Sequence, residues 1–176
     1  MKHTIDPYTA QQIATLQARL EKKLGPEWIS QRPGQGGKKC GYVQASKVIE
    51  LANDVFGFNG WSSQIKECQV DFVDEKGNDK FDMGLSVIMR VTLRDGTYHE
   101  DVGYGHVENF KGKGLAFEKS KKEATTDAMK RALRSFGNVL GNCIYDPIYM
   151  KEVVKMKVEP KAFKLSDLHR HSSYAT

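Results

Sequence analysis

A run of basic residues between positions 111 and 134 is the part of the sequence whose side chains could act most directly on a ligand. It holds eight lysines and arginines against three acidic residues. Placed on a helix, Lys130 and Arg134 fall on one side with Arg131 at its flank, opposite an aliphatic arc. Lysine and arginine bind phosphate oxygens without reading bases, so this spacing favours a surface that follows a nucleic-acid backbone. The alternative is a solvated helix face with no ligand, although such faces mix charge signs more evenly.

A second group of candidates flanks a glycine-rich segment, residues 28–42, with the sequence WISQRPGQGGKKCGY. The glycines at its centre predict a loop, and their spacing does not match a phosphate-binding P-loop. Arg32 lies before the glycines and Tyr42 after them. A guanidinium and an aromatic ring beside flexible backbone suit contacts with sugar, phosphate and base. The alternative is that Arg32 is an ordinary surface charge and Tyr42 a core aromatic.

Two acidic groupings raise the question of catalysis. At strand spacing His99 and Asp101 share one side, whereas Glu67, Asp71 and Asp74 could form a cluster for Mg²⁺. No third ligand or nucleophile accompanies the first pair. In the second group, the alternation of the strand does not clearly bring the three carboxylates to one place. The sequence also lacks Walker, zinc-protease and serine-hydrolase motifs. A nuclease is therefore the weaker hypothesis, no metal or cofactor is predicted, and a scaffold whose basic helix binds acidic partner proteins is a further alternative.

The elements that must position the basic run can be identified from hydrophobic periodicity. Residues 61–73 predict a strand whose alternation shifts phase midway, which a bulge would explain. Residues 81–93 alternate cleanly, and residues 97–104 return as a third strand after a hairpin turn at Asp95-Gly96. Three long antiparallel strands with one apolar face require a helix laid over them.

Residues 115–137 are the candidate for that helix. The predicted fold class is therefore α+β, with a β-β-β-α core in which an antiparallel three-stranded sheet packs under a long basic helix. Extra helices are predicted on the N-terminal side of this core, as described next.

Two helices are predicted before the sheet. Thr9 and Gln12 form a capping box for a helix that runs to residue 24. The apolar spacing of residues 46–56 predicts the second helix. Phe58 and Trp61 follow it closely, and we expect them to fill the core at the turn between helix and sheet.

Glycines punctuate the chain on both sides of the long helix. Gly103 and Gly105 are assigned to the link between the third strand and the helix, and they do not match a dinucleotide-binding fingerprint. Beyond the helix, Gly137 and Gly141 predict left-handed turns. Residues 146–154 predict a further short helix.

Length and composition limit the class of protein. At 176 residues the chain is predicted to hold one domain, residues 1–154, followed by a basic tail or linker, residues 155–176. The net charge of +5 favours an anionic partner. Three widely spaced cysteines indicate a reducing compartment rather than disulfides or a structural zinc. No apolar run approaches the length of a membrane span, so we expect a soluble, intracellular protein with no membrane partner.

Four long blocks of the sequence resemble a known family. They are NDVFGFNGW (53–61), DFVDEKG (71–77), VTLRDGTYHEDVGYG (91–105) and KKEATTDAMKRALRSFGNVLGNCIYD (121–146). On these blocks the chain is similar to the N-terminal domain of the eukaryotic Rad-fifty-two recombination protein family, the single-strand annealing proteins of homologous recombination. The resemblance covers about residues 15–150 and implies the same β-β-β-α core.

The resemblance also implies an assembly and a way of binding DNA. Family members form closed rings of about ten or eleven subunits. Single-stranded DNA winds around the outside of the ring in a basic groove, with its sugar-phosphate backbone inward and its bases exposed for pairing. No nucleotide is hydrolysed and no metal is needed.

Two DNA sites follow from matching this sequence to the family pattern. The inner site would comprise Arg32, Tyr42, Lys130, Arg131 and Arg134. An outer site, which would engage a second strand or duplex DNA, would use Lys80 and Lys111.

The basic helix and the resemblance together predict sequence-independent binding of single-stranded DNA and ATP-independent annealing of complementary strands. Homologous recombination and double-strand break repair in the nucleus are the implied setting. Relatives carry a long C-terminal region that binds the recombinase and the single-strand-binding protein. Because this chain stops at Thr176, we expect it to be either an excised domain or a short paralogue, with those partners bound through the missing region.

Overall fold

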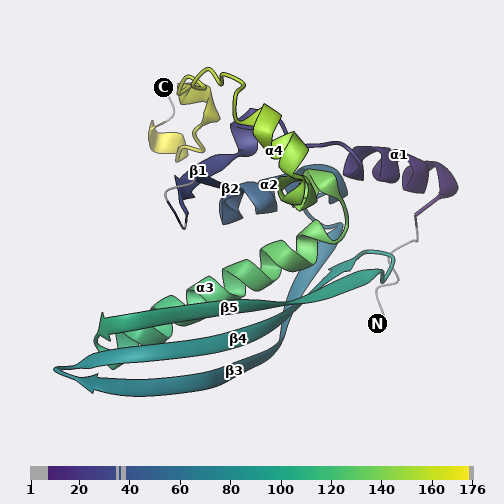
Figure 1. The fold of residues 1–176 in the computed structure, drawn as a ribbon. Coiled ribbons are helices and arrows are strands. Elements are labelled where there is room, and N and C mark those ends of the chain that lie inside the picture. Colours follow the sequence, from purple (N-terminus) through teal and green to yellow (C-terminus); the bar gives the residue numbers. More distant parts are fainter. Residues whose placement is uncertain (1–7, 35, 37–38, 175–176) are drawn as a thin grey trace.

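A long helix, α3, lies across a three-stranded antiparallel sheet, and most of the remaining elements gather at one end of it (Figure 1). The computed structural model describes residues 8–34, 36 and 39–174. Its helices and strands are α1 (Ala10–Leu20), β1 (Ser30–Pro33), β2 (Lys39–Tyr42), α2 (Ala45–Phe56), β3 (Trp61–Gly77), β4 (Lys80–Leu93), β5 (Tyr98–Lys111), α3 (Lys113–Arg134) and α4 (Pro147–Val153). Short 3-10 helices are η1 (Pro26–Trp28), η3 (Asn138–Leu140), η4 (Asn142–Tyr145), η5 (Leu165–Asp167) and η6 (Ser172–Tyr174). The β-β-β-α core and the two N-terminal helices are confirmed.

The central strand of the sheet, β4, sets the hydrophobic core. Its apolar residues alternate from Phe81 to Leu93 and are all buried, as the sequence predicts. The ladder between β3 and β4 shifts register between Ile65 and Glu67, which is where the apolar phase changes in the sequence. The predicted bulge is therefore confirmed. A tight turn at Asn78 and Asp79, both with positive φ, joins the two strands.

Strand β5 continues beyond the predicted end at residue 104 to Lys111, and it contains both Gly103 and Gly105. Both glycines face α3. A Cβ at Gly103 would collide with the backbone of Ala124 and Ala128, and one at Gly105 would collide with the backbone of Ser120. The assignment of these glycines to a link is wrong, because they are strand residues that let the helix backbone approach the sheet closely.

Helix α3 packs on the sheet through small side chains. Its fully buried residues are Ala116, Ser120, Ala124, Ala128, Ala132 and Leu133. Spacing by four places the first five on one stripe, so the predicted inward face is confirmed. The helix begins two residues earlier than predicted and ends at Arg134. Neither α3 nor any other helix of residues 8–34, 36 and 39–174 is long and apolar enough to cross a membrane.

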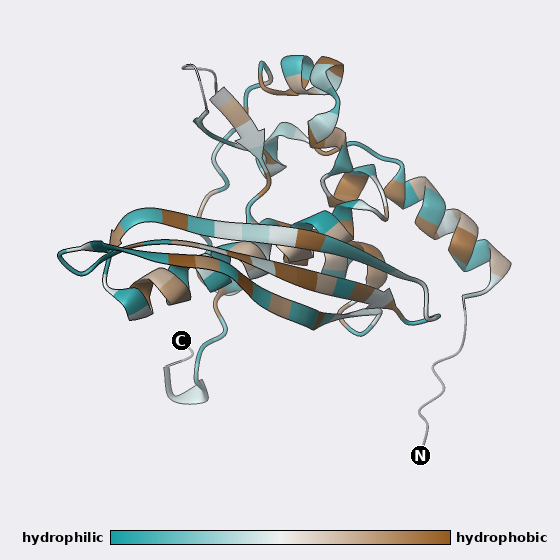
Figure 2. Cartoon of the chain, turned by 60° about the horizontal axis from the view of Figure 1, so that its bottom comes forward, coloured by the Kyte–Doolittle hydropathy of each residue, from teal (hydrophilic) through white to brown (hydrophobic). Residues whose placement is uncertain are grey.

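The helix covers β4 and β5 but leaves β3 open. On β3, Ile65, Val70 and Phe72 remain 51%, 43% and 39% exposed. Figure 2, in which the sheet lies in front of α3, shows hydrophobic positions recurring along the strands. A long edge strand that exposes both its ladder and apolar side chains is a surface that soluble proteins usually cover.

The glycine-rich segment forms a β-hairpin rather than a simple loop. Strands β1 and β2 pair antiparallel, with Arg32 opposite Cys40. The predicted loop was too long, because Gly34 and Gly36 lie in the connection whereas the residues on both sides of it, including Gly41, pair as strands. Helix α4 supports the hairpin, since the Met150 methyl fills the space where a Cβ of Gly41 would lie.

Three local expectations differ from the structure. Helix α1 ends at Leu20 rather than at residue 24, because the chain turns to bury Leu24 in the core. Phe58 is 85% exposed and does not fill the core, whereas Trp61 packs against it. Gly137 has extended backbone, although Gly141 adopts the predicted left-handed conformation.

Helix α4, which was predicted as a short helix, is held by its N-cap, Asp146. The Asp146 carboxylate lies 2.6 Å from Lys23 Nζ and accepts the backbone N–H groups of Ile148 and Tyr149. The Lys23 ammonium and then the Tyr149 N–H hold the pKa of Asp146 below its ordinary value. The ionised carboxylate therefore stabilises the folded chain. This contribution is fully present above the unfolded-state pKa and is lost as the pH falls through the folded-state pKa.

We expect Asp146→Ala to lower the melting temperature at pH 7, because the substitution removes both the cap and the ion pair. The difference from wild type should narrow as the pH drops below 3.8, the ordinary pKa of the group. Thermal melts between pH 7 and pH 3 measure this directly. A difference that stays constant over the whole range would contradict the role given to the ionised carboxylate.

The segment after α4 lies on the surface. Every described residue from 154 to 174 is exposed, and its only regular structure is two short 3-10 helices. Exposure alone does not define a domain boundary. The division of the chain after residue 154 therefore stays a prediction.

Candidate nucleic-acid interface

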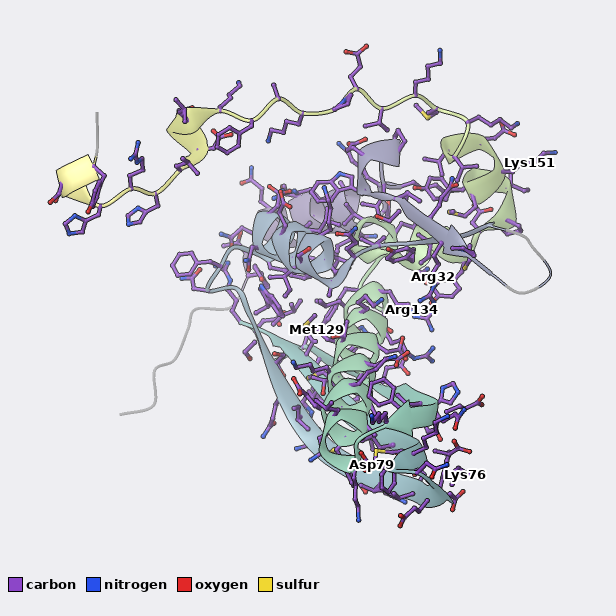
Figure 3. All side chains as sticks on the ribbon, turned by 90° about the vertical axis from the view of Figure 1, so that its left-hand side faces the viewer. Arg32, Lys76, Asp79, Met129, Arg134 and Lys151 are labelled. Atoms are coloured by element: carbon purple, nitrogen blue, oxygen red, sulfur yellow. The ribbon has the colours of Figure 1, made fainter. Side chains whose placement is uncertain are left out.

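The five side chains predicted for the inner site line a single cavity of about 270 Å³. They are Arg32, Tyr42, Lys130, Arg131 and Arg134. The cavity lies between the β1–β2 hairpin and the C-terminal half of α3, and Figure 3 shows the hairpin residue Arg32 close to the helix residue Arg134. Two segments that are distant in the sequence therefore place their basic and aromatic groups together. That these residues bind DNA stays a prediction.

The hairpin ladder places Arg32 and Tyr42 on the same face. Tyr42 pairs with Ser30, and Arg32 pairs with Cys40, so the two side chains are diagonal neighbours. The guanidinium carbon of Arg32 lies 5.4 Å from the centroid of the Tyr42 ring. This cation–π contact orients the guanidinium, and no hydrogen bond joins its N–H groups to any residue that the structure describes. Tyr42 is half-buried beside the cavity.

The three cations of α3 differ in how firmly they are held. Arg131 Nε donates to Asp101 at 3.0 Å, and Arg134 Nη2 lies 4.0 Å from the same carboxylate. The guanidinium of Arg134 also lies 4.3 Å from the centroid of the Tyr145 ring. Among the described residues, Lys130 makes no ion pair. Helix α3 thus contributes to the cavity two oriented guanidinium groups and one ammonium that can adjust to its ligand.

The charge of the cavity lining is strongly positive. Four cationic side chains line it together with one carboxylate, Asp127. That carboxylate accepts the backbone N–H of Tyr104 at 3.3 Å on the edge of the sheet. A hollow with this excess of positive charge attracts polyanions and concentrates them.

The basic surface continues beyond the cavity along α3. A second hollow of about 530 Å³ shares Arg32, Asp127 and Lys130 with the first, and it adds Lys122, Thr126 and one further acid, Glu123. Lys122 and Thr126 belong to the basic stretch singled out in the sequence, but neither was assigned to a DNA site. Positions 122, 126 and 130 follow one another at intervals of four, so they lie on one face of the helix.

Asp101 and His99 were weighed in the sequence as possible catalytic or metal-binding residues. They do share one face of β5, but that face is turned toward α3. The His99 ring packs edge-on against Phe136, with ring centroids 4.5 Å apart, and Asp101 pairs with Arg131. Within residues 8–34, 36 and 39–174, no group of three or more His, Cys, Asp or Glu side chains could hold a metal. Through these contacts with Phe136 and Arg131, both side chains help to hold the helix and the turn after it on the sheet.

The two residues predicted for the outer site are cross-strand neighbours. Lys80 at the start of β4 pairs with Lys111 at the end of β5. Beside them Asp82 accepts the backbone N–H of Asn109 and lies 3.1 Å from Lys76. The Asn109 N–H and then Lys76 hold the pKa of Asp82 below its ordinary range. Asp82 thus pairs with Lys76 rather than with the two strand-end lysines, of which Lys111 is exposed and Lys80 is half-buried.

The residues predicted for the inner and outer sites lie toward opposite ends of α3. Lys111 precedes the first residue of the helix, and Arg134 is its last residue. At 1.5 Å per residue, the 22-residue helix separates them by about 30 Å. In Figure 3, Lys76 and Asp79 lie at the lower end of the sheet, whereas Arg32 and Arg134 lie in the middle of the view. One chain can therefore present two distinct basic surfaces.

The sequence of the chain is similar to those of DNA repair proteins. Residues 12–163 match the Rad52/22 family of double-strand break repair proteins. The chain is 68% identical over 171 residues to the DNA repair and recombination protein mus-11 of Neurospora crassa, covering 97% of this chain and 28% of the relative. It is 54% identical to rad22 of Schizosaccharomyces pombe, covering 98% of this chain and 37% of the relative. It is 50% identical to RAD52 of Saccharomyces cerevisiae, covering 88% and 33%. The chain thus spans about a third of the length of these relatives.

Proposed function

Because the chain belongs to the Rad52/22 family of double-strand break repair proteins, we propose that it binds single-stranded DNA without regard to sequence and anneals complementary strands. The observation that carries the proposal is the cavity in which four cations and Tyr42 meet on a hairpin and a rigid helix. Repair and recombination are the roles named for its relatives, and the nucleus is the compartment we propose.

The chemistry of the cavity suits a grip on the DNA backbone. Arginine forks and a lysine ammonium bind phosphate oxygens through charge-assisted hydrogen bonds. Such contacts fix the position of a strand and carry no sequence information. A strand held in this way keeps its Watson–Crick edges free, and its neutralised phosphates repel a second strand less. Pairing and stacking of the product duplex then supply the free energy, so annealing needs no ATP.

We also propose that the chain works as a closed ring of about ten or eleven subunits, which repeats the basic surface along the strand. The uncovered β3 edge supports this proposal, since its half-exposed Ile65, Val70 and Phe72 offer a neighbouring copy an apolar face. Native mass spectrometry of the purified chain tests the assembly. A monomer at micromolar concentration would remove the continuous groove from the mechanism.

An annealing assay tests the proposed function. Labelled complementary oligonucleotides should pair faster with the protein than without it, in the absence of ATP. Equal rates would instead favour a scaffold for acidic partner proteins. The same strands incubated with the protein and Mg²⁺ should keep their full length, because shortened products would indicate a nuclease.

For the outer site, we expect Lys111→Ala to separate binding from annealing. The first strand should bind as in wild type, because Lys111 lies at the far end of α3 from the cavity. Capture of the second strand should weaken by about fivefold in 0.1 M salt, the effect of losing one phosphate contact. Lys157→Ala, in the exposed segment after α4, is the matched control. Equal loss of first-strand binding and of annealing would mean that the two basic surfaces are one site.

A further inference from the structure

We propose that Asp101 is a positioning residue that presents the cavity arginines to phosphate. This inference rests on the proposed function, because it names a residue that prepares the same site for DNA. Asp101 lies on β5, beneath the helix that carries Arg131 and Arg134. It would act on the bound strand only through those two guanidinium groups.

The Asp101 carboxylate is itself held in place by the strand. Its Oδ1 accepts the backbone N–H of Val102 at 2.8 Å as well as Arg131 Nε at 3.0 Å. The side chain is only 22% exposed. Its direction is therefore set by backbone that belongs to the sheet ladder, opposite Met89 of β4. A carboxylate fixed in this way can impose an orientation on a longer and more flexible partner.

The contact with Arg131 leaves the useful edge of the guanidinium open. Arg131 donates to Asp101 through Nε. Among the described residues, none makes a hydrogen bond with its terminal nitrogens, Nη1 and Nη2. Because a guanidinium is a planar fork, fixing the Nε side directs the two terminal nitrogens to the other side, where they can bind phosphate in a bidentate way.

Arg134 is oriented by the same carboxylate and by a ring. Asp101 Oδ2 lies 4.0 Å from Arg134 Nη2, and the Tyr145 ring covers one guanidinium face with its centroid at 4.3 Å. Arg131 and Arg134 are one helical turn apart, so a single acid on the neighbouring strand reaches both. One residue thereby sets the relative direction of two phosphate-binding groups.

Charge alone predicts the opposite effect for Asp101. A carboxylate beside a bound phosphate repels it, so removing that carboxylate should strengthen DNA binding if it did nothing else. A positioning role predicts weaker binding when it is removed. The sign of the change in affinity therefore distinguishes the two accounts.

The experiment measures Asp101→Ala in two backgrounds. Affinity for an oligo-dT strand is followed by fluorescence anisotropy over a range of salt concentrations, with and without Arg131→Ala and Arg134→Ala. In the wild-type background we expect affinity to fall by about fivefold in 0.1 M salt, equivalent to one phosphate contact. In the background that lacks both arginines, the same substitution should leave binding unchanged or strengthen it. Equal weakening in both backgrounds would indicate a structural defect and overturn the proposal, as would an unweakened single variant.

Two further variants and the wild type complete the test. Asp101→Asn keeps a side-chain oxygen that can accept from Val102 and Arg131, so it should retain more affinity than Asp101→Ala. Asp54→Ala breaks an ion pair with Arg19 outside the cavity and reports the effect of charge alone, without weakening binding. Wild-type protein that bound no single strand would overturn the proposed function and this inference together. Normal wild-type binding with an unweakened Asp101→Ala would overturn only the inference.

Discussion

Replacing both Arg131 and Arg134 by glutamine is expected to weaken single-strand binding by roughly 25-fold in 0.1 M salt. Each phosphate contact contributes about 0.7 to the slope of log affinity against log salt for single strands, which is about fivefold at this concentration. The slope should therefore fall by about 1.4 as well. Both residues line the cavity, and the glutamine side chains keep much of the volume while removing the charge.

The control for this variant removes the same charge elsewhere. Lys164 and Arg170 lie in the exposed segment after α4 and can be changed to glutamine together. Titration of labelled oligonucleotides at several salt concentrations should give nearly the wild-type slope for this control. If the cavity variant kept the wild-type slope, the arginines would not be neutralising phosphates.

The second large effect is expected on stability. We expect Gly105→Ala to destabilise the fold by about 3 kcal/mol, because overpacking of a closed interface has a cost of this order. A methyl group at this position would collide with the backbone of Ser120, which cannot move without shifting the helix from the sheet. Since α3 carries three of the four inner-site cations, single-strand binding should fall along with stability.

A matched substitution in α3 should act in the opposite direction. Gly114 lies in the first turn of the helix, and a Cβ there meets nothing within 4 Å. Gly114→Ala is therefore expected to stabilise by up to about 1 kcal/mol through helix propensity. Urea denaturation at one protein concentration compares the two variants. A Gly105→Ala protein as stable as wild type would show that helix and strand are not in backbone contact.

The core could be predicted from the sequence because its signals are local. The alternation from Phe81 to Leu93 is kept in the structure without a shift, since every odd position of the central strand is buried. The bulge after Ile65 could also be predicted, because one extra residue shifts the apolar side chains of the strand from odd to even positions. Asp146 likewise begins α4 through its own side chain.

What could not be predicted depends on contacts between distant segments. Gly103 looked like a linker because the period of a strand says nothing about how closely a helix will lie on it. The pairing of Arg32 opposite Cys40 depends on a hairpin whose strands are only four residues each. Asp101 was correctly predicted to share one face of its strand with His99. Its ion pair with Arg131 of α3 could not be predicted, because it joins residues that are distant in the sequence. The residues of the cavity were found because a family resemblance supplied the grouping that spacing alone does not.

Chemical footprinting of a bound strand of mixed sequence tests most directly whether the chain grips the DNA backbone and leaves the bases free. Hydroxyl radicals report access to the sugars, and methylation at adenine N1 and cytosine N3 reports access to the Watson–Crick edges. We expect the sugars to be protected on binding, while methylation of both ring nitrogens continues at the rate seen in the free strand. Protected Watson–Crick edges beside freely cleaved sugars would contradict the account.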